Sequence, residues 1–220
     1  MELLKELQIK TNNMELYYEA LRHPSYNNEN HLKDNHERLE FLGDAVLELL
    51  ISDYLYLHKS IEEGEMTKLR AAYVCENALY EYALKINLPD YIMLGKGEEA
   101  NGGKKRKTIL ADTFEALIGA IYLDKGLEEA KGFIQMTIIP YLKEETVFFK
   151  DYKSQLQEAV QTNKKSVIYD LIEESGPSHK KKFTYVVKVD GIVLGKGSSG
   201  SKKEAEQEAA KDAMRKAKKA

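Results

Sequence analysis

The segment Leu39–Ile51, with the sequence LEFLGDAVLELLI, is the feature that most limits how this chain can fold. Its apolar residues spread around the whole helical wheel, so a helix here is expected to be buried on most of its sides. Four of its residues are not apolar, namely Glu40, Gly43, Asp44 and Glu48. Together with Glu37, the three acids fall within about 80° of one another on the wheel. Buried acids at this spacing repel one another and lose hydration, so a cation is expected to compensate them.

A second apolar segment repeats this arrangement. Ile109–Leu123 reads ILADTFEALIGAIYL, and its Asp112 and Glu115 are three positions apart, on one face of a helix. Two such helices can bring these acids together with Glu40 and Asp44. An all-oxygen site favours Mg²⁺ or Mn²⁺, and no histidine or cysteine stands at the spacing that zinc requires. The alternative is that the acids pair with Lys or Arg of other helices, although neither apolar segment contains a basic residue.

Five short segments resemble the ribonuclease III family in their residues and in their order. His36–Asp44, with the sequence HERLEFLGD, is similar to the signature segment of that family. The other four are His23–Tyr26, Glu63–Met66, Ala111–Leu117 and Asp151–Lys153. The resemblance implies an endonuclease that cleaves both strands of double-stranded RNA, with Mg²⁺ as its cofactor and Mn²⁺ as an expected substitute. It implies that the catalytic residues are also the metal ligands, namely Glu40, Asp44, Asp112 and Glu115.

Further roles follow from the same resemblance. Glu115 would be the most critical ligand, and Glu37 and Glu63 would support the cleavage valley. Phe41 would lie at the contact between the subunits of a homodimer, although a place in the core is an open alternative. Glu48 matches no role in the family, and we expect it to face solvent or to be paired. The family's products carry 5′-phosphate and 3′-hydroxyl ends, and the expected substrates are precursor ribosomal RNA and other structured transcripts.

The charge of the chain changes sign near residue 150. Residues 1–149 contain 17 basic and 26 acidic residues, whereas residues 150–220 contain 16 basic and 10 acidic ones. An acidic region followed by a basic one suggests that the first holds cations and the second a polyanion. The first region has few prolines and a helical spacing of Leu, Ala, Glu and Lys. It predicts helices near 2–8, 14–22, 35–58, 65–71, 74–86, 108–123 and 126–143.

The basic region has a different pattern. It predicts, in order, a helix at 151–162, strands at 166–172, 182–189 and 192–197, and a helix at 201–217. Asp190-Gly191 is a hairpin signal, and Ser201 with Glu204 forms the sequence of a capping box. We therefore expect an all-α catalytic domain over 1–146, a linker over 147–150, and an α+β domain over 151–220. In the last, an antiparallel sheet would carry both helices on one face.

This α-β-β-β-α region resembles a double-stranded RNA-binding domain. The similar segments are Tyr152–Glu158, Gly176–Phe183 and Ser201–Gln207. The resemblance implies RNA contacts from Ser154, Gln157, His179, Lys180, Lys202 and Lys203. The last two lysines stand at a helix N-terminus, where the backbone N–H groups and the helix dipole favour phosphate. Contacts of this kind recognise the A-form shape of the duplex rather than its sequence.

The remaining features exclude several classes of protein. No apolar run approaches the roughly 18 residues that span a bilayer, and a single cysteine with a charged N-terminus predicts a cytoplasmic protein. The segment 95–107 reads as a mobile basic loop and lacks phosphate-loop spacing, so no nucleotide cofactor is expected. Two alternatives stay open: a non-catalytic regulator that binds double-stranded RNA, and a di-iron protein. The second is disfavoured because the Glu-x-x-His pairs of such sites are missing.

Overall fold

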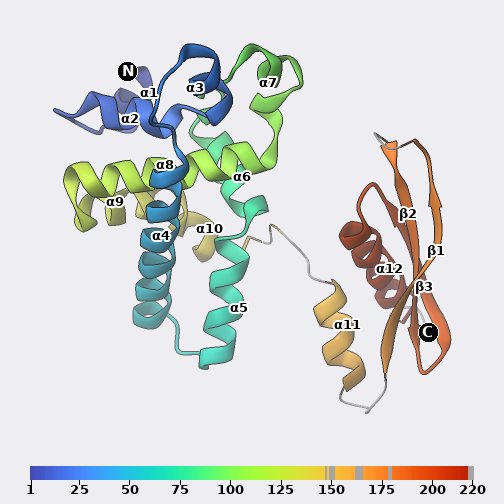
Figure 1. Ribbon diagram of the computed structural model, residues 1–220. Coiled ribbons are helices and arrows are strands. Elements are labelled where there is room, and N and C mark those ends of the chain that lie inside the picture. The colour runs from blue at the N-terminus through green and yellow to red at the C-terminus, as the bar shows by residue number, and fades with distance from the viewer. Residues whose placement is uncertain (147, 149–151, 162–165, 178–179, 218–220) are drawn as a thin grey trace. The chain divides into compact units, whose positions relative to one another are not determined.

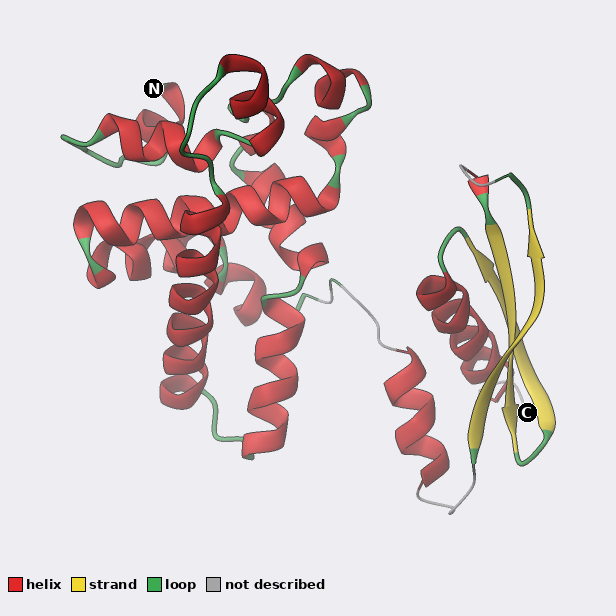
Figure 2. Cartoon of the chain, viewed as in Figure 1, coloured by secondary structure: helices red, strands yellow, loops and turns green. Residues whose placement is uncertain are grey.

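The computed structural model of the chain describes residues 1–146, 148, 152–161, 166–177 and 180–217. The chain divides into two compact units, Met1–Phe149 and Lys150–Ala220 (Figure 1). The described part of the first unit contains helices and connecting turns, whereas the second combines helices with a sheet (Figure 2). The predicted fold classes, all-α followed by α+β, are therefore confirmed. The predicted linker 147–150 lies outside the described residues except for Phe148.

The first unit is organised around its two longest helices, which cross each other (Figure 1). These are α4 (Glu37–His58) and α8 (Lys107–Lys125). The other helices of the unit are α1 (Glu2–Glu6), α2 (Met14–Leu21), α3 (Pro24–Asn30), α5 (Glu63–Tyr73), α6 (Glu76–Lys85), η1 (Leu88–Asp90), α7 (Lys96–Ala100), η2 (Gly103–Lys105), α9 (Leu127–Thr137) and α10 (Ile139–Lys143). Helix α8 lies in the middle of the core, and its Phe114, Leu117 and Ile118 are fully buried.

Helices α4 and α8 touch through their backbones at two glycines. A β-carbon at Gly43 would lie 1.8 Å from the carbonyl oxygen of Glu115. A β-carbon at Gly119 would lie 2.3 Å from the carbonyl oxygen of Leu39. Neither position has room for a side chain, so glycine is required for the two helices to approach this closely. The contact places the acidic stripe of α4 beside the acidic face of α8.

Helix α4 is buried on one side only, so the prediction that it is buried on most sides was wrong. Leu47 and Ile51 are fully buried, whereas Phe41 is 82% and Leu49 is 56% exposed. Phe41 is therefore not part of the core of the chain. We use the term apolar stripe of α4 for Phe41, Ala45, Leu49 and Tyr56, which are all exposed and lie within about 80° of one another around the helix.

Two local predictions in the first unit were wrong for identifiable reasons, and one short helix, α3, was not predicted. The helix expected at 126–143 is divided into α9 and α10, because Pro140 has no N–H to bond the carbonyl of Met136. Pro24 begins α3 as well as following α2, since the Nδ1 atom of His23 accepts a hydrogen bond from the Ser25 N–H at 3.2 Å. The segment 95–107 contains α7 and η2 rather than a plain loop.

The second unit has the predicted order of elements. They are α11 (Tyr152–Gln161), β1 (Val167–Ser175), β2 (Lys182–Val189), β3 (Ile192–Ser199) and α12 (Lys202–Ala217). The strands pair antiparallel in the order β1-β2-β3, and side chains of both helices join the same core as the sheet. Helix α12 lies close to β3, where a β-carbon at Gly195 would meet the Ala209 carbonyl oxygen at 2.2 Å.

The turn and the helix cap predicted for the second unit are both formed, the cap in part. Asp190 and Gly191 both have positive φ, 49° and 80°, as the hairpin turn requires. The Ser201 Oγ accepts a hydrogen bond from the Glu204 N–H at 3.2 Å, which is half of the predicted capping box. The Glu204 carboxylate instead accepts a hydrogen bond from the Ser199 hydroxyl at 2.6 Å. This side chain therefore joins the end of β3 to the start of α12.

Candidate functional site

Three carboxylates converge where α4 crosses α8. Glu40, Asp112 and Glu115 each offer an oxygen, and these oxygens lie within 4.8 Å of one another. All three residues are half-buried. Asp44 is exposed and lies outside this group, but its charge contributes to the raised pKa values of Glu40 and Glu115. We call Glu40, Asp112 and Glu115 the carboxylate group; three of the four predicted ligands form it, and Asp44 lies beside it.

Burial and mutual repulsion hold the carboxylate group in an unfavourable electrostatic state. Burial, followed by the charges of four nearby acids, raises the pKa of Glu115 to about 8. Burial and neighbouring acids also raise the pKa of Glu40, and burial followed by the charge of Glu76 raises the pKa of Asp112. In the described part of the chain, no lysine or arginine forms an ion pair with any of the three. Among the described residues, the structure therefore contradicts the alternative that Lys or Arg side chains pair with these three acids.

This arrangement fits a hard divalent cation. Converging carboxylate oxygens are the ligands that such ions prefer, and a cation relieves the repulsion that raises the three pKa values. The proton that Glu115 retains near neutral pH without a metal, because its pKa is raised to about 8, must be released when a cation binds. The chemistry that the site offers is therefore metal-assisted reaction of an anionic substrate, since the acids alone would repel one.

Glu37 and Glu48 stand near the carboxylate group, and the second was not expected there. Glu37 is exposed in the first turn of α4, accepts a hydrogen bond from the Asn35 amide at 3.1 Å, and helps to raise the pKa of Glu40. Glu48 is half-buried, and its charge is among those that raise the pKa of Glu115. Its place on the same 80° stripe of the wheel was the sequence signal that could have identified it.

The structure does not bring Glu63 to the carboxylate group of its own chain. Glu63 begins α5 and lines a pocket that also includes Leu55 of α4. Leu55 is 15 positions from Glu40, which corresponds to about 22 Å along the helix axis. Glu63 therefore lies beside the C-terminal part of α4, whereas the carboxylate group lies near the N-terminal end of this helix.

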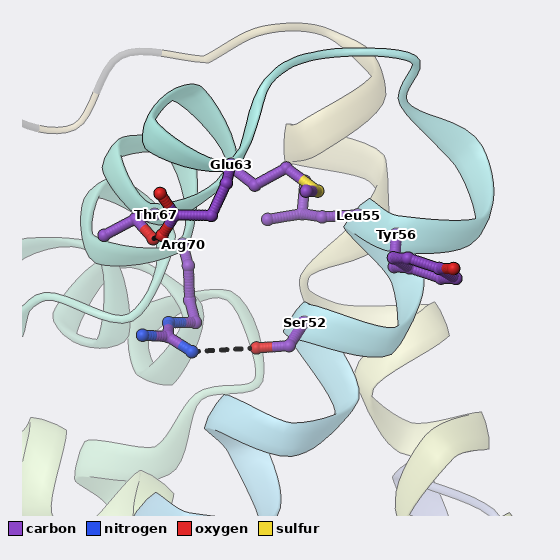
Figure 3. A pocket seen from close by; sticks show the side chains of 7 residues that line it. Ser52, Leu55, Tyr56, Glu63, Thr67 and Arg70 are labelled. Carbon is purple, nitrogen blue, oxygen red and sulfur yellow. Dashed lines mark hydrogen bonds between the residues drawn. The ribbon is translucent and has the colours of Figure 1, made fainter.

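The pocket beside Glu63 is partly apolar and was not anticipated from the sequence (Figure 3). Its volume is about 270 Å³, and it is lined by Ser52, Leu55, Tyr56, Glu63, Met66, Thr67 and Arg70. The Arg70 guanidinium donates a hydrogen bond to the Ser52 hydroxyl at 3.0 Å, and the Thr67 hydroxyl donates to Glu63 at 3.0 Å. Tyr56, the last residue of the apolar stripe of α4, is 76% exposed at this pocket. We call it the α4–α5 pocket.

The predicted RNA contacts of the second unit are distributed over α11, α12 and the connection between β1 and β2. Ser154 and Gln157 are three positions apart on α11, with Ser154 exposed and Gln157 half-buried. Lys202 and Lys203 are exposed in the first turn of α12, and the Lys202 ammonium lies 5.6 Å from the centre of the Phe183 ring. Lys180 is exposed. The remaining contact, His179, lies outside the described residues.

Comparisons with known proteins agree with both units. Residues 13–142 match a family model described as ribonuclease-III-like, and residues 152–217 match the double-stranded RNA binding motif. A Ribonuclease 3 from Listeria monocytogenes is 48% identical over 224 residues, covering 98% of this chain and 96% of the relative. A Ribonuclease 3 from Syntrophomonas wolfei is 50% identical over 214 residues, covering 96% of this chain and 92% of the relative.

Among solved structures, a nuclease domain of ribonuclease III from Campylobacter jejuni is similar with a TM-score of 0.59 and 41% identity. The similarity covers 62% of this chain and 94% of that one. Fold and site thus define a nuclease with a helical unit that bears the carboxylates and a second unit that binds double-stranded RNA. The chain belongs to the ribonuclease III family, and it is an endoribonuclease for double-stranded RNA. The family is metal-dependent, and the carboxylate group is able to hold a metal ion.

The helices of the described residues are too short or too polar to cross a bilayer. None of them combines the necessary length with sufficient apolar character.

Proposed function

We propose that this protein hydrolyses phosphodiesters on both strands of duplex RNA with Mg²⁺ held by Glu40, Asp44, Asp112 and Glu115. The observation that carries the proposal is the convergence of half-buried acids to which no described lysine or arginine is paired. The products carry 5′-phosphate and 3′-hydroxyl ends. The substrates are stems of precursor ribosomal RNA and of other structured transcripts in the cytoplasm, where a single cysteine stays reduced.

The four acids have different tasks in this proposal. A bound Mg²⁺ supplies positive charge to the phosphate and lowers the pKa of the attacking water. Glu115 must lose its proton before it can act as a ligand, because its pKa is raised to about 8. Glu40 and Asp112 complete the set from the two helices, and Asp44 joins it from the exposed edge of α4. Mn²⁺ substitutes because it accepts the same oxygen ligands.

The second unit binds the duplex by its shape. Lys202 and Lys203 meet phosphates, supported by their exposed place in the first turn of α12 and by the positive end of its dipole. Ser154 and Gln157 on α11 reach 2′-hydroxyl groups in the minor groove. Lys180 and His179 approach the same duplex from the connection between β1 and β2.

The apolar stripe of α4 is the surface on which we propose that two copies associate. In a two-fold dimer the same surface of each copy forms the contact. With the axis perpendicular to α4, the two helices run antiparallel, so residues near one end of the stripe face residues near the other end of the partner's stripe. Phe41 and Tyr56 are these two ends, and both are largely exposed. The α4–α5 pocket, next to Tyr56, then receives the partner subunit's Phe41. The structure of the Campylobacter jejuni nuclease domain is likewise described with a region involved in dimer formation.

Such a dimer also provides a role for Glu63. Because Glu63 lines the α4–α5 pocket, pairing through the stripe brings it toward the Phe41 end of the partner's α4. The carboxylate group lies at that end, since Glu40 precedes Phe41. Glu63 and Glu37 then both border a valley with two carboxylate groups, one for each RNA strand. Glu63 thus supports the site of the other subunit rather than its own.

The test is incubation of the protein with a long RNA duplex, once with Mg²⁺ and once with EDTA. Cleavage only with Mg²⁺, with 5′-phosphate ends on the products, is expected. Duplex binding without cleavage under any divalent metal would overturn the proposal and would favour the non-catalytic RNA-binding regulator.

A further inference from the structure

His36 is a buried polar side chain that the proposed function does not use. It is 3% exposed, and neither nitrogen of its ring has a hydrogen-bond partner. Buried polar groups are nearly always hydrogen-bonded, so an unpartnered imidazole requires an explanation. The ring lies one helical turn before Glu40, and its Nδ1 atom is 3.5 Å from the Glu40 Oε2 atom. That separation is slightly longer than a hydrogen bond and connects the imidazole to one member of the carboxylate group.

Parts of the chain that are distant in sequence hold His36 in this position. Its backbone N–H donates a hydrogen bond to the carbonyl of Arg22 at 3.0 Å. Its ring lies against that of His23, with the centres 5.6 Å apart. His23 is in turn fixed, since its N–H donates to the Met93 carbonyl at 3.1 Å and its Nδ1 accepts from the Ser25 N–H. With its backbone and its neighbour both held, the buried imidazole has little freedom to turn away from Glu40.

The environment also determines what the imidazole can donate. The ring is almost completely buried, and burial without a hydrogen-bonded partner disfavours a charged imidazolium, so the neutral ring is the form to consider. A neutral imidazole carries one proton, on either Nδ1 or Nε2. With the proton on Nε2, a lone pair of Nδ1 would face the Glu40 oxygen. With the proton on Nδ1, the ring can donate to a Glu40 carboxylate that has lost its own proton.

We propose that His36 is a positioning residue for the metal, whose Nδ1–H donates to Glu40 Oε2 and leaves the other Glu40 oxygen to the ion. The proposal rests on the proposed metal site and adds a residue to it. A glutamate side chain has three rotatable bonds, so a free carboxylate samples many positions that do not suit an ion. Hydrogen bonds to metal ligands restrict such sampling, and their loss typically lowers metal affinity by about 10- to 100-fold.

The test compares three variants of the full-length protein. His36→Leu removes the donor and keeps an apolar side chain in the buried site, and His36→Asn keeps an N–H donor. His58→Leu is the matched control, because His58 is exposed at the opposite end of the same helix. The affinity for Mn²⁺ is measured without RNA by electron paramagnetic resonance. We expect His36→Leu to weaken Mn²⁺ binding by about 10- to 100-fold, with His36→Asn and His58→Leu close to the wild type.

The outcomes separate this proposal from the proposed function. A wild-type protein that binds no Mn²⁺ would overturn the metal site itself. A wild-type protein that binds Mn²⁺, with a folded His36→Leu variant of equal affinity, would overturn the role of His36 alone. If His36 served only stability, His36→Leu would lower the unfolding temperature and leave the Mn²⁺ affinity of the folded protein unchanged.

A measurement on the wild-type protein covers the case in which His36→Leu does not fold. Nitrogen resonances of ¹⁵N-labelled histidines distinguish a protonated Nδ1 from a protonated Nε2, and the spectrum of His36→Asn assigns those of His36. We expect a protonated Nδ1 whose resonance shifts when Mg²⁺ is added. A proton on Nε2 in the Mg²⁺-loaded protein would overturn the proposal.

Discussion

Gly43→Ala tests whether the close contact of α4 and α8 is what assembles the carboxylate group. The alanine β-carbon would lie 1.8 Å from the carbonyl oxygen of Glu115, whereas real β-carbons stay at least 3.0 Å from such atoms. The two helices must therefore separate by about 1.2 Å at this point. The obstructing atoms belong to the backbone of α8, so no side-chain rotation can relieve the clash.

Two effects of opposite sign decide the stability of this variant. Replacing a helical glycine by alanine stabilises the helix by about 0.5–1 kcal/mol. Overpacking a close contact costs about 1–3 kcal/mol and sometimes more. Because the obstructing atoms are backbone and α8 lies in the core, we take the upper end of the overpacking cost, about 3 kcal/mol, which leaves a net loss of about 2 kcal/mol. Cleavage should fall by about 100-fold, as for other displacements of roughly 1 Å in catalytic groups.

The assay is denaturation by urea at one fixed protein concentration, because association of two copies adds to apparent stability. Cleavage of duplex RNA with Mg²⁺ is measured alongside. The matched control is Gly132→Ala in α9, where a β-carbon meets nothing within 4 Å. This control should gain about 0.5–1 kcal/mol and cleave normally. The reasoning fails if Gly43→Ala is as stable as the control and cleaves at the wild-type rate.

Four further outcomes are expected. Glu115→Gln should bind duplex RNA but lose cleavage, and a variant that cuts at the wild-type rate would contradict the assigned site. Because the pKa of Glu115 is raised from 4.5 to about 8, its protonation favours the folded state, so the metal-free protein should lose stability as the pH rises through that interval. Glu115→Gln should flatten this part of the profile of unfolding temperature against pH, and two parallel profiles would refute the cause. Lys202→Ala combined with Lys203→Ala should weaken duplex binding and reduce its salt dependence by about one unit of slope for each phosphate that is no longer bound. An unchanged slope would mean that neither lysine meets phosphate. Phe41→Glu should convert the dimer to a monomer in sedimentation experiments, since a charge would enter the apolar contact, and a persisting dimer would place the interface elsewhere.

The carboxylate group was largely predictable because helical geometry is local. The spacing of Glu40 from Asp44, and of Asp112 from Glu115, assigns each pair to one face of its own helix without knowledge of the fold. The meeting of the two faces was an inference from buried charge, and Glu40, Asp112 and Glu115 do meet. Asp44 is exposed and lies beside them rather than among them, although it shares a stripe of α4 with the half-buried Glu40.

What could not be predicted depends on contacts between distant parts of the chain. The apolar pattern of α4 is the same whether Phe41 faces its own core or another surface, so the helical wheel overstated its burial. The composition of 95–107 is typical of a loop, but contacts such as the Gly95 N–H with the Ser25 hydroxyl at 2.9 Å hold it in short helices. His36 could not be recognised because its position depends on the backbone of Arg22.

The union of α4 and α8 has a consequence for the timing of activity during synthesis. Glu40 and Glu115 are 75 positions apart in the chain, and their carboxylates meet only when the two helices have docked. Chains emerge from the ribosome N-terminus first, and domains generally fold as units. A nascent chain that ends before α8 therefore has only Glu40 of the carboxylate group and lacks the core helix that carries Asp112 and Glu115. An unfinished copy of this enzyme is thus unable to cut the RNA stems of the ribosome that is making it.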